Sequence, residues 1–231
     1  MVIKMRFFRK LFVFFIIFIL AFFTICFIIG YNAYSKALEE KPLITRIDEV
    51  TKKENYVSFK NLPKNYINAV IAVEDHRFYN HGPIDVIGIG RALWVNLKSR
   101  GLQQGGSTIT QQVAKNLVFS QEDSFERKLG EFFAAYEIEK NYNKDEILAI
   151  YANTCYFGDG YYGIYDASMG YYNKKPKDLN LNEASMLAGI PNAPSVYSPN
   201  VNPDLAKKRQ QHVLSKMIEY GYISKEEATN I

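Results

Sequence analysis

The sequence predicts a mainly α-helical protein, with one membrane-spanning helix at the N-terminus and a helical domain after it. Three observations support this prediction. An almost uninterrupted apolar run covers residues 11–29, with Thr24 as its only polar member. From Pro63 onward, helix-start signals recur, and apolar residues follow them three and four positions apart. Alternation typical of a strand is confined to residues 56–59.

The first helix is predicted at residues 11–30, behind a tail of residues 1–10. At about 1.5 Å per residue the apolar run spans roughly 28 Å, close to the hydrocarbon thickness of a bilayer. The tail has no acidic residue, and its basic residues are Lys4, Arg6, Arg9 and Lys10. This bias predicts a single pass of the cytoplasmic membrane, with the N-terminus inside and the chain after Gly30 extracytoplasmic. The alternative is a signal peptide cleaved after Ser35-Lys36-Ala37, but the apolar run is longer than a typical signal-peptide core and favours an uncleaved anchor.

Charge and cysteine content argue against several classes of protein. The chain has 28 basic and 24 acidic residues, and the tail accounts for the surplus. The predicted domain is therefore neutral overall, whereas a nucleic-acid-binding domain normally carries a basic surplus. Cys26 lies inside the predicted span and Cys155 far beyond it, so we expect no disulfide between them. No Cys/His cluster has zinc-binding spacing, and we predict no such metal site.

Residues 31–55 mix polar and charged side chains and are predicted to form a stalk. The stalk should end in a strand or an extended lead-in at residues 56–59, before Pro63 opens the next helix. Residues 56–231 are then predicted to form one domain, held together by packing alone. We expect no transpeptidase domain, because no further Ser-x-x-Lys context is found toward Ile231.

The helices of this domain are predicted from their caps. In a capping box, Ser, Thr or Asn is followed three residues later by Glu or Gln, and the sequence offers Thr108 with Gln111, Asn143 with Glu146, and Ser224 with Glu227. Asp123 is predicted to cap a further helix with Glu126, and Asn202 precedes a proline suited to the first helical position. Apolar stripes follow at Phe125, Leu129, Phe132 and Tyr136, and at Val213, Leu214 and Met217.

One segment, residues 92–97, has an amphipathic composition. It reads Ala-Leu-Trp-Val-Asn-Leu and is flanked by Arg91, Lys98 and Arg100. Such a composition suits a helix that lies at the membrane interface. A surface helix packed on the core explains it nearly as well, and the sequence leaves both interpretations open.

The first cluster of candidate catalytic residues is Ile71-Ala-Val-Glu74-Asp75-His-Arg-Phe78-Tyr-Asn-His81. Apolar residues before Glu74 recur at helical spacing, so this glutamate is predicted to leave the end of a helix beside an apolar wall. Low-dielectric surroundings disfavour a charged carboxylate, and this is how a glutamate becomes a general base or acid. The alternative is a helix-end acid paired with Arg77 or His81.

The second cluster is Gly105-Gly-Ser-Thr-Ile-Thr-Gln-Gln-Val-Ala-Lys115. Its glycines permit close backbone approach, and the helix predicted after them would offer free N–H groups, which bind anions. The segment lacks the Walker pattern, so an NTPase is not supported, but it suits a ligand that carries phosphate. Further hydrogen-bond donors come from Ser107, Thr108, Gln111, Gln112 and Lys115.

The third cluster places Arg127 and Lys128 one helical turn before Glu131. A solvated ion pair of this kind contributes well under about 1 kcal/mol and has no function of its own. The functional interpretation is a second acid kept ionised by two cations, which also face a polyanionic substrate.

Together these clusters resemble, in order, the motifs of the peptidoglycan glycosyltransferases, the domain shared by monofunctional transglycosylases and class A penicillin-binding proteins. The resemblance covers roughly residues 56–231, and the shared order and spacing argue against chance. The matching segments are residues 74–81, 106–112 with Lys115, 127–131, 144–148, 156–158 and 187–195.

The resemblance implies a lysozyme-like α fold with a small, membrane-facing jaw subdomain. It implies polymerisation of lipid II, a disaccharide-pentapeptide on undecaprenyl pyrophosphate, into β-1,4 glycan with inversion and release of undecaprenyl pyrophosphate. By position, Glu74 resembles the general base that deprotonates the acceptor's 4-hydroxyl, and Glu131 the second carboxylate, which assists at the pyrophosphate. The residues implied to bind substrate are Asp75, Phe78, His81, Ser107, Thr108, Gln111, Gln112, Lys115, Asn116, Arg127 and Lys128.

The implied partners are lipid II, the growing glycan chain and the cytoplasmic membrane, with wall-synthesis proteins left open and nucleic acid excluded. No cofactor is required structurally, although Mg²⁺ or Mn²⁺ could assist at the pyrophosphate.

The chain departs from the family pattern at three places: Gly82-Pro83 where the family has x-Gly after the histidine, Asp123 where many members carry a basic residue, and Tyr151-Ala-Asn-Thr-Cys155 in place of a more apolar stretch. Two other functions therefore stay open. One is a lytic enzyme on a lysozyme-like fold, which cleaves glycan with Glu74 as the acid. The other is a non-catalytic member that binds lipid II or serves as a scaffold.

Overall fold

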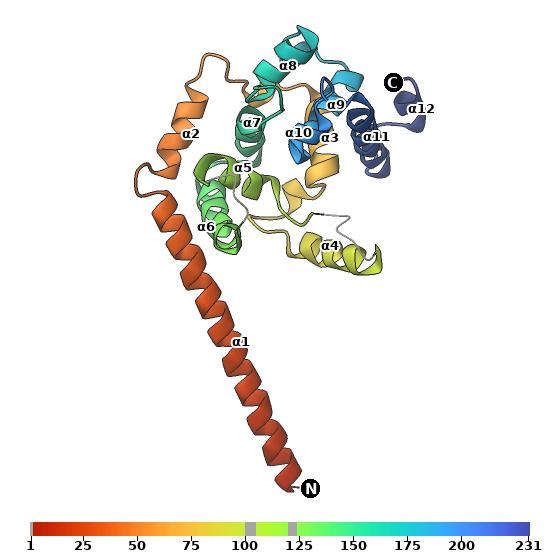
Figure 1. Ribbon diagram of the computed structural model, residues 1–231. Helices are drawn as coiled ribbons and strands as arrows, with labels where there is room; N and C mark the ends of the chain where they lie inside the picture. Colours follow the sequence, from red (N-terminus) through yellow and green to blue (C-terminus); the bar gives the residue numbers. More distant parts are fainter. Residues whose placement is uncertain (1, 100–104, 120–123) are drawn as a thin grey trace.

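The computed structural model describes residues 2–99, 105–119 and 124–231, and this part of the chain is almost entirely helical (Figure 1). Its only β-type pairing is an isolated antiparallel bridge between Tyr156 and Tyr162. The prediction of a mainly α fold is confirmed. In chain order, the helices and 3₁₀ turns (η) are α1 (Val2–Ala37), α2 (Leu43–Thr51), η1 (Phe59–Asn61), α3 (Lys64–Glu74), η2 (Phe78–Asn80), α4 (Val86–Ser99), α5 (Ile109–Val118), α6 (Phe125–Asn141), α7 (Lys144–Thr154), α8 (Ile164–Tyr172), η3 (Pro176–Asp178), α9 (Leu181–Gly189), η4 (Ile190–Asn192), α10 (Pro194–Tyr197), α11 (Pro203–Glu219) and α12 (Lys225–Thr229).

The three predicted capping boxes are confirmed at the starts of α5, α7 and α12. In each, the side chain of Thr108, Asn143 or Ser224 accepts from a backbone N–H three residues on, and the residue there accepts from the cap's own N–H. Helix α6 begins differently from the prediction, because its cap is Ser124, whose hydroxyl accepts from the N–H of Arg127. Asp123 lies outside the described residues.

Helix α7 forms the centre of the core. All its residues from Ile147 to Asn153 are buried, because α2, α5, α6 and α8 pack around it. The amide of Asn153 donates to the carbonyl of Val57 (2.8 Å) and its Oδ1 accepts from the N–H of Val57 (2.9 Å). Both backbone groups of Val57 are thereby paired with a side chain. This explains why the extended lead-in at residues 56–59 needs no neighbouring strand.

The region predicted as a stalk, residues 31–55, differs from a solvated spacer. Its first residues continue α1 to Ala37, and α2 follows with Leu43, Ile47 and Val50 buried in the core. Their spacing places them on one face of a helix, and burying this face stabilises the domain. Arg46, on the same helix, donates to the carbonyls of Ala37 (2.7 Å) and Leu117 (3.0 Å), so it ties α2 to the ends of α1 and α5.

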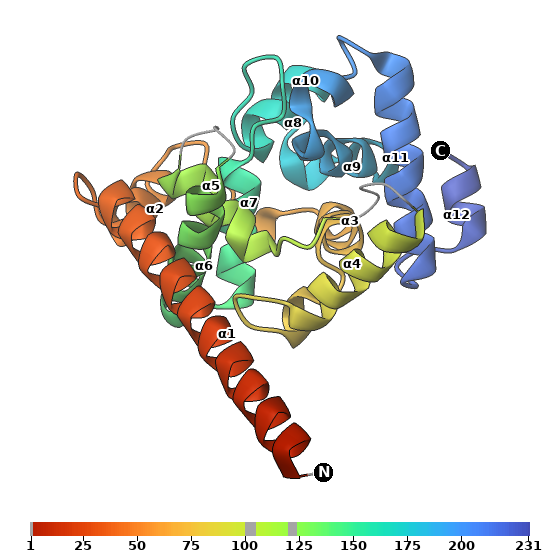
Figure 2. The same cartoon turned by 60° about the horizontal axis from the view of Figure 1, so that its bottom comes forward.

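Helix α1 projects from the domain, and the half of it nearer the domain lies against α6 (Figures 1 and 2). Within the described residues, Phe8–Ala37 is the one segment long and apolar enough to cross a membrane. Phe27 and Tyr31 meet the ring of Phe133 at centroid distances of 5.1 and 5.8 Å. Gly30 lets the two helices approach closely, since a Cβ there would lie 2.9 Å from the Cβ of Leu129. Helix α1 is thus packed on the helix that carries the third cluster.

Gly30→Ala should loosen the packing of α1 on α6. The added methyl group has no room, and overpacking of this kind costs about 1–3 kcal/mol. Thermal unfolding of the full chain in detergent micelles should show a lower Tm. The matched control is Gly90→Ala in α4, where a Cβ meets nothing within 4 Å. A Tm for Gly30→Ala equal to that of the control would contradict the tight contact.

Candidate active site

A pocket of about 530 Å³ lies between the end of α3, the first turns of α5 and α6, and one face of α11. Both acids singled out from the sequence line it, Glu74 from α3 and Glu131 from α6. Its cationic side chains are Arg91, Lys115, Arg127, Lys128, Arg209 and Lys216. Two carboxylates and several cations in one pocket suit a ligand that combines hydroxyl groups with a diphosphate.

Glu74 is the last residue of α3, and its side chain is 10% exposed. The sequence predicted an apolar wall around it, but the structure places polar partners there. Gln112 Nε2 donates to its Oε2 at 2.9 Å, and Arg209 Nη2 donates to its Oε1 at 3.2 Å. Donors from α5 and α11 therefore fix the direction of the carboxylate within the pocket.

Glu131 is more deeply buried, with a side chain 1% exposed. Arg127 Nε lies 3.3 Å from its Oε1, and Lys128 Nζ forms an ion pair with its Oε2. Lys128 Nζ also donates to the hydroxyl of Ser107 at 2.8 Å, which ties the segment before α5 to α6. The third cluster is therefore a charge network around a buried carboxylate, and the interpretation as a fully solvated ion pair does not describe it.

The N-terminus of α5 differs from the predicted anion site. The N–H of Thr108 donates to Gln111 Oε1, and the N–H of Gln111 donates to Thr108 Oγ1. The N–H of Ile109 donates to Asp75 Oδ2 at 3.1 Å. Side chains thus pair the N–H groups of Thr108, Ile109 and Gln111, which the sequence analysis had left free for a phosphate.

Comparison with known proteins assigns the chain to a family. Residues 40–218 match the family model described as Transglycosylase. This chain belongs to the transglycosylase family. Penicillin-binding protein 1A of Neisseria flavescens is 48% identical over 172 residues, which are 74% of this chain and 22% of that protein. Penicillin-binding protein 1F of Bacillus subtilis is 46% identical over 178 residues, 77% of this chain and 25% of that protein.

The chain thus spans about a quarter of the length of these relatives. Among solved structures, penicillin-binding protein 1A from Haemophilus influenzae is 31% identical and covers 52% of this chain and 15% of its own. Its TM-score of 0.36 is too low to carry an argument about the fold.

The residues that the transglycosylase motifs implied for substrate binding separate into two groups. Those that line the pocket are Ser107, Gln111, Gln112, Lys115, Arg127 and Lys128. Those not among its lining residues are Asp75, Phe78, His81, Thr108 and Asn116. Each of the second group has a structural contact elsewhere, so their predicted contact with substrate does not follow from the structure.

Three of these residues contact other parts of the domain. Phe78 is fully buried, with Lys144 Nζ 4.4 Å from its ring centre. The hydroxyl of Thr108 donates to the carbonyl of Pro83 at 2.9 Å, so this hydrogen bond fixes the Gly82-Pro83 segment to the start of α5. Asn116 faces a different pocket and donates to Cys155 Sγ at 3.8 Å.

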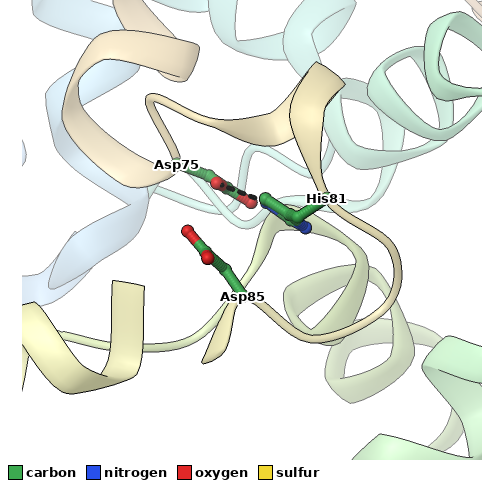
Figure 3. A group of neighbouring side chains, drawn as sticks. All are labelled: Asp75, His81 and Asp85. Carbon is green, nitrogen blue, oxygen red and sulfur yellow. Dashed lines mark hydrogen bonds and ion pairs between the residues drawn. The ribbon is translucent and has the colours of Figure 1, made fainter. Parts of the chain in front are cut away.

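Asp75 and His81 belong to a buried group with Asp85 (Figure 3). His81 Nε2 donates to Asp75 Oδ1 at 2.8 Å, while the other oxygen of Asp75 accepts from the N–H of Ile109. Asp85 Oδ2 lies 3.3 Å from Arg77 Nε. By spacing alone the three side chains could surround a metal ion. These side chains instead form hydrogen bonds and ion pairs with other protein groups. We therefore interpret the three residues as a structural link that fixes α5 relative to α3.

The pocket includes a face of α11 that the sequence analysis missed. Arg209, His212 and Lys216 line it together with Tyr220 just after the helix. Their spacing of three and four residues was visible, but only the apolar stripe at Val213 on the same helix was used. Since α11 is far from the other motifs in the chain, the contact between Arg209 and Glu74 had no local signal.

Removal of the His81 imidazole should destabilise the domain in a pH-dependent way. Burial lowers the pKa of His81, but hydrogen bonds to Asp75 and the carbonyl of Gly82 outweigh this and raise its pKa above the usual 6.5. The protonated ring therefore stabilises the fold fully below about pH 6.5, and its contribution declines as pH rises through the raised value.

His81→Gln should accordingly cost about 1–3 kcal/mol at pH 6 and less at pH 9, measured by chemical denaturation at each pH. His212→Gln, which replaces an exposed histidine of α11, is the control and should lack this loss at pH 6. An equal loss for His81→Gln at both pH values would contradict the assignment.

Proposed function

We propose that this chain is a peptidoglycan glycosyltransferase that polymerises lipid II into β-1,4 glycan and releases undecaprenyl pyrophosphate. One observation carries the proposal: Glu74 and Glu131, from helices far apart in the chain, line a single pocket with cationic side chains around them. Membership of the transglycosylase family and the resemblance to class A penicillin-binding proteins support it.

In the proposed reaction Glu74 is the general base. The 4-hydroxyl of the acceptor sugar attacks the anomeric carbon of the donor and gives its proton to a carboxylate oxygen of Glu74. The bond from that carbon to the pyrophosphate oxygen breaks with its electron pair, so the α linkage becomes β in one displacement. Hydrogen bonds from Gln112 and Arg209 hold the carboxylate in one orientation for this proton transfer.

The leaving diphosphate is assigned to other side chains of the same pocket. Lys115, Arg127 and Lys128 line it with Ser107. Charge-assisted donors of this kind stabilise the negative charge that grows on the leaving oxygen. Glu131 keeps Arg127 and Lys128 in place, which makes it a positioning carboxylate in this proposal.

A divalent cation at the pyrophosphate stays a prediction, and no step above depends on it. Mg²⁺ and Mn²⁺ bind several oxygen ligands at once. Around Glu131 the described residues offer one carboxylate, and both of its oxygens face the cations Arg127 and Lys128. These side chains do not by themselves fit a divalent-cation site.

We further propose that the domain lies on the outer face of the cytoplasmic membrane. Helix α4 lies at the edge of the domain on the side toward which α1 projects (Figures 1 and 2). Its exposed apolar side chains include Val86, Ile87, Leu93, Leu97 and Trp94, the last 70% exposed. This exposure favours the interfacial interpretation of residues 92–97 over a helix packed on the core. A substrate with a lipid tail could then reach the pocket without leaving the bilayer.

The two rival functions are less well supported. A lytic enzyme acts on glycan without a diphosphate and has no need for Lys115, Arg127 and Lys128 in one pocket. A non-catalytic member was suggested by Gly82-Pro83 and Asp123. The first of these forms an ordinary turn bonded to Thr108, and the second lies outside the described residues.

Glu74→Gln should abolish polymerisation and leave binding nearly intact, because the amide keeps its shape but takes up no proton. The rate of glycan formation from labelled lipid II in detergent should fall by about 10²–10⁴-fold. Binding of lipid II to the same variant is the control for folding. Normal turnover would remove Glu74 from the role of base, and shortened preformed glycan in the wild-type assay would favour the lytic rival.

Lys115→Gln should weaken recognition of the diphosphate. Loss of one charge-assisted hydrogen bond corresponds to about 1.5–3 kcal/mol, so kcat/KM for lipid II should fall about ten- to a hundredfold. Lys140→Gln, at an exposed position of α6, is the matched control for loss of one positive charge. Equal kinetics for the two variants would exclude Lys115 from the diphosphate site.

A further inference from the structure

Three side chains that line the pocket are stacked on one another and join α4 to α11. His76 comes from the turn after α3, Arg91 from α4, and Tyr220 from the end of α11. The imidazole of His76 lies on the ring of Tyr220, with centroids 4.4 Å apart and planes 15° apart. Arg91 Nη1 lies 2.7 Å from Nε2 and 3.1 Å from Nδ1 of the same imidazole. We call this group the Arg91–His76–Tyr220 clamp.

Helix α4 packs loosely on the rest of the domain. Across the described residues, it has no extensive packing against another helix. The residues of its inner face include Ile89 and Ala92, which lie near Gly106. Much of its apolar surface is exposed, as described above. The clamp thus joins α4 to the end of α11, a helix that lines the pocket with Arg209 and Lys216.

The contact between Arg91 and His76 favours a neutral imidazole. Arg91 Nη1 is close to both ring nitrogens at once, which places it over the face of the ring and not in line with one lone pair. The guanidinium is always charged, and a protonated imidazole would place a second positive charge directly beside it. Proton uptake by His76 therefore introduces repulsion into the clamp.

The charges around His76 do not cancel this effect. Burial and the guanidinium of Arg91 lower the pKa of His76 below its usual 6.5, and Arg77 acts in the same direction. Asp75 and Asp85 oppose them, and Glu219 on α11 also faces the ring. Lys216, on the same helix, lies 5.8 Å from the ring centre of Tyr220.

We propose that the Arg91–His76–Tyr220 clamp holds α4 against α11 along the wall of the pocket, and that it opens when His76 takes up a proton. The proposal rests on the proposed function, because the pocket it closes is the one assigned to lipid II. His76 and Tyr220 are positioning residues that act through Arg91. Opening would widen the path by which the substrate and the lengthening glycan enter or leave.

The closed clamp contains a neutral imidazole, so its stability should fall as the pH falls. The clamp is fully stable above the usual imidazole value of about 6.5 and weakens as pH falls below it. One proton is taken up on opening, so the ratio of closed to open forms should fall by at most about tenfold per pH unit.

The test is a distance measurement on the full chain in lipid nanodiscs. Spin labels are attached to cysteines introduced at Lys98 in α4 and Lys208 in α11, both exposed, with Cys26 replaced by Ser and the buried Cys155 retained. Pulsed electron resonance should give a narrow distance distribution at pH 8 and a longer, broader one at pH 5.5. An unchanged distribution would overturn the proposal.

Variants separate protonation of His76 from other effects of acid. His76→Gln carries a side chain that does not titrate, so its distance distribution should stay narrow at both pH values. His76→Lys carries a permanent positive charge, so its distance distribution should be broad at both. His212→Gln, the control for loss of another pocket histidine, should respond as the wild type does. If His76→Gln still opened at pH 5.5, His76 would not be the sensor.

A lipid II polymerisation assay on the same proteins tests the proposed function separately. Protonation of Glu74, the proposed base, should give both the wild type and His76→Gln an acid limb in the pH profile of kcat/KM. The two profiles should still differ below about pH 6.5, where the clamp opens in the wild type alone, and identical profiles would overturn the role of the clamp in turnover. Absence of polymer from the wild type at every pH would overturn the proposed function, while the distance measurement would still decide whether the clamp exists.

Discussion

A buried negative charge sets the arrangement of the site. Glu131 is almost inaccessible to solvent, and a carboxylate in such a place costs several kcal/mol unless cations and hydrogen bonds compensate it. Arg127 and Lys128, one turn earlier on α6, supply that compensation. Because Lys128 also holds Ser107, the same network fixes the segment that leads into α5. The cationic side of the pocket is therefore a consequence of how one acid is buried.

The neighbouring residues Glu74 and Asp75 show how one helix end serves two purposes. Helix α3 ends at Glu74, whose carboxylate enters the pocket between donors from α5 and α11. Asp75 points instead to His81 and to the N–H of Ile109, so it binds the start of α5 to the end of α3. The candidate base and the helix that supplies one of its donors are thus held together by the next residue in the chain.

Local signals predicted the helices well and the surroundings of the acids poorly. The caps at Thr108, Asn143 and Ser224 depend on contacts within four residues, and all three form as predicted. The apolar face of α2 was also visible as a helical stripe, but its burial depends on where the chain returns, so residues 31–55 were interpreted as a stalk. The same limit explains why Arg209, 135 positions after Glu74, was missed.

The sequence by itself determined a mainly α chain with an apolar N-terminal helix, the starts of several helices, and the identity of the two acids and of half of the cations in the pocket. These features follow from spacing and from side-chain chemistry within a few residues. The tertiary structure alone decided which groups meet. It placed Asp75, Phe78, His81, Thr108 and Asn116 in contacts outside the pocket lining, paired the N–H groups of Ile109 and Gln111 with side chains, and brought α11 to Glu74. Such pairings depend on how distant helices pack against one another, and no local pattern in the chain specifies that packing.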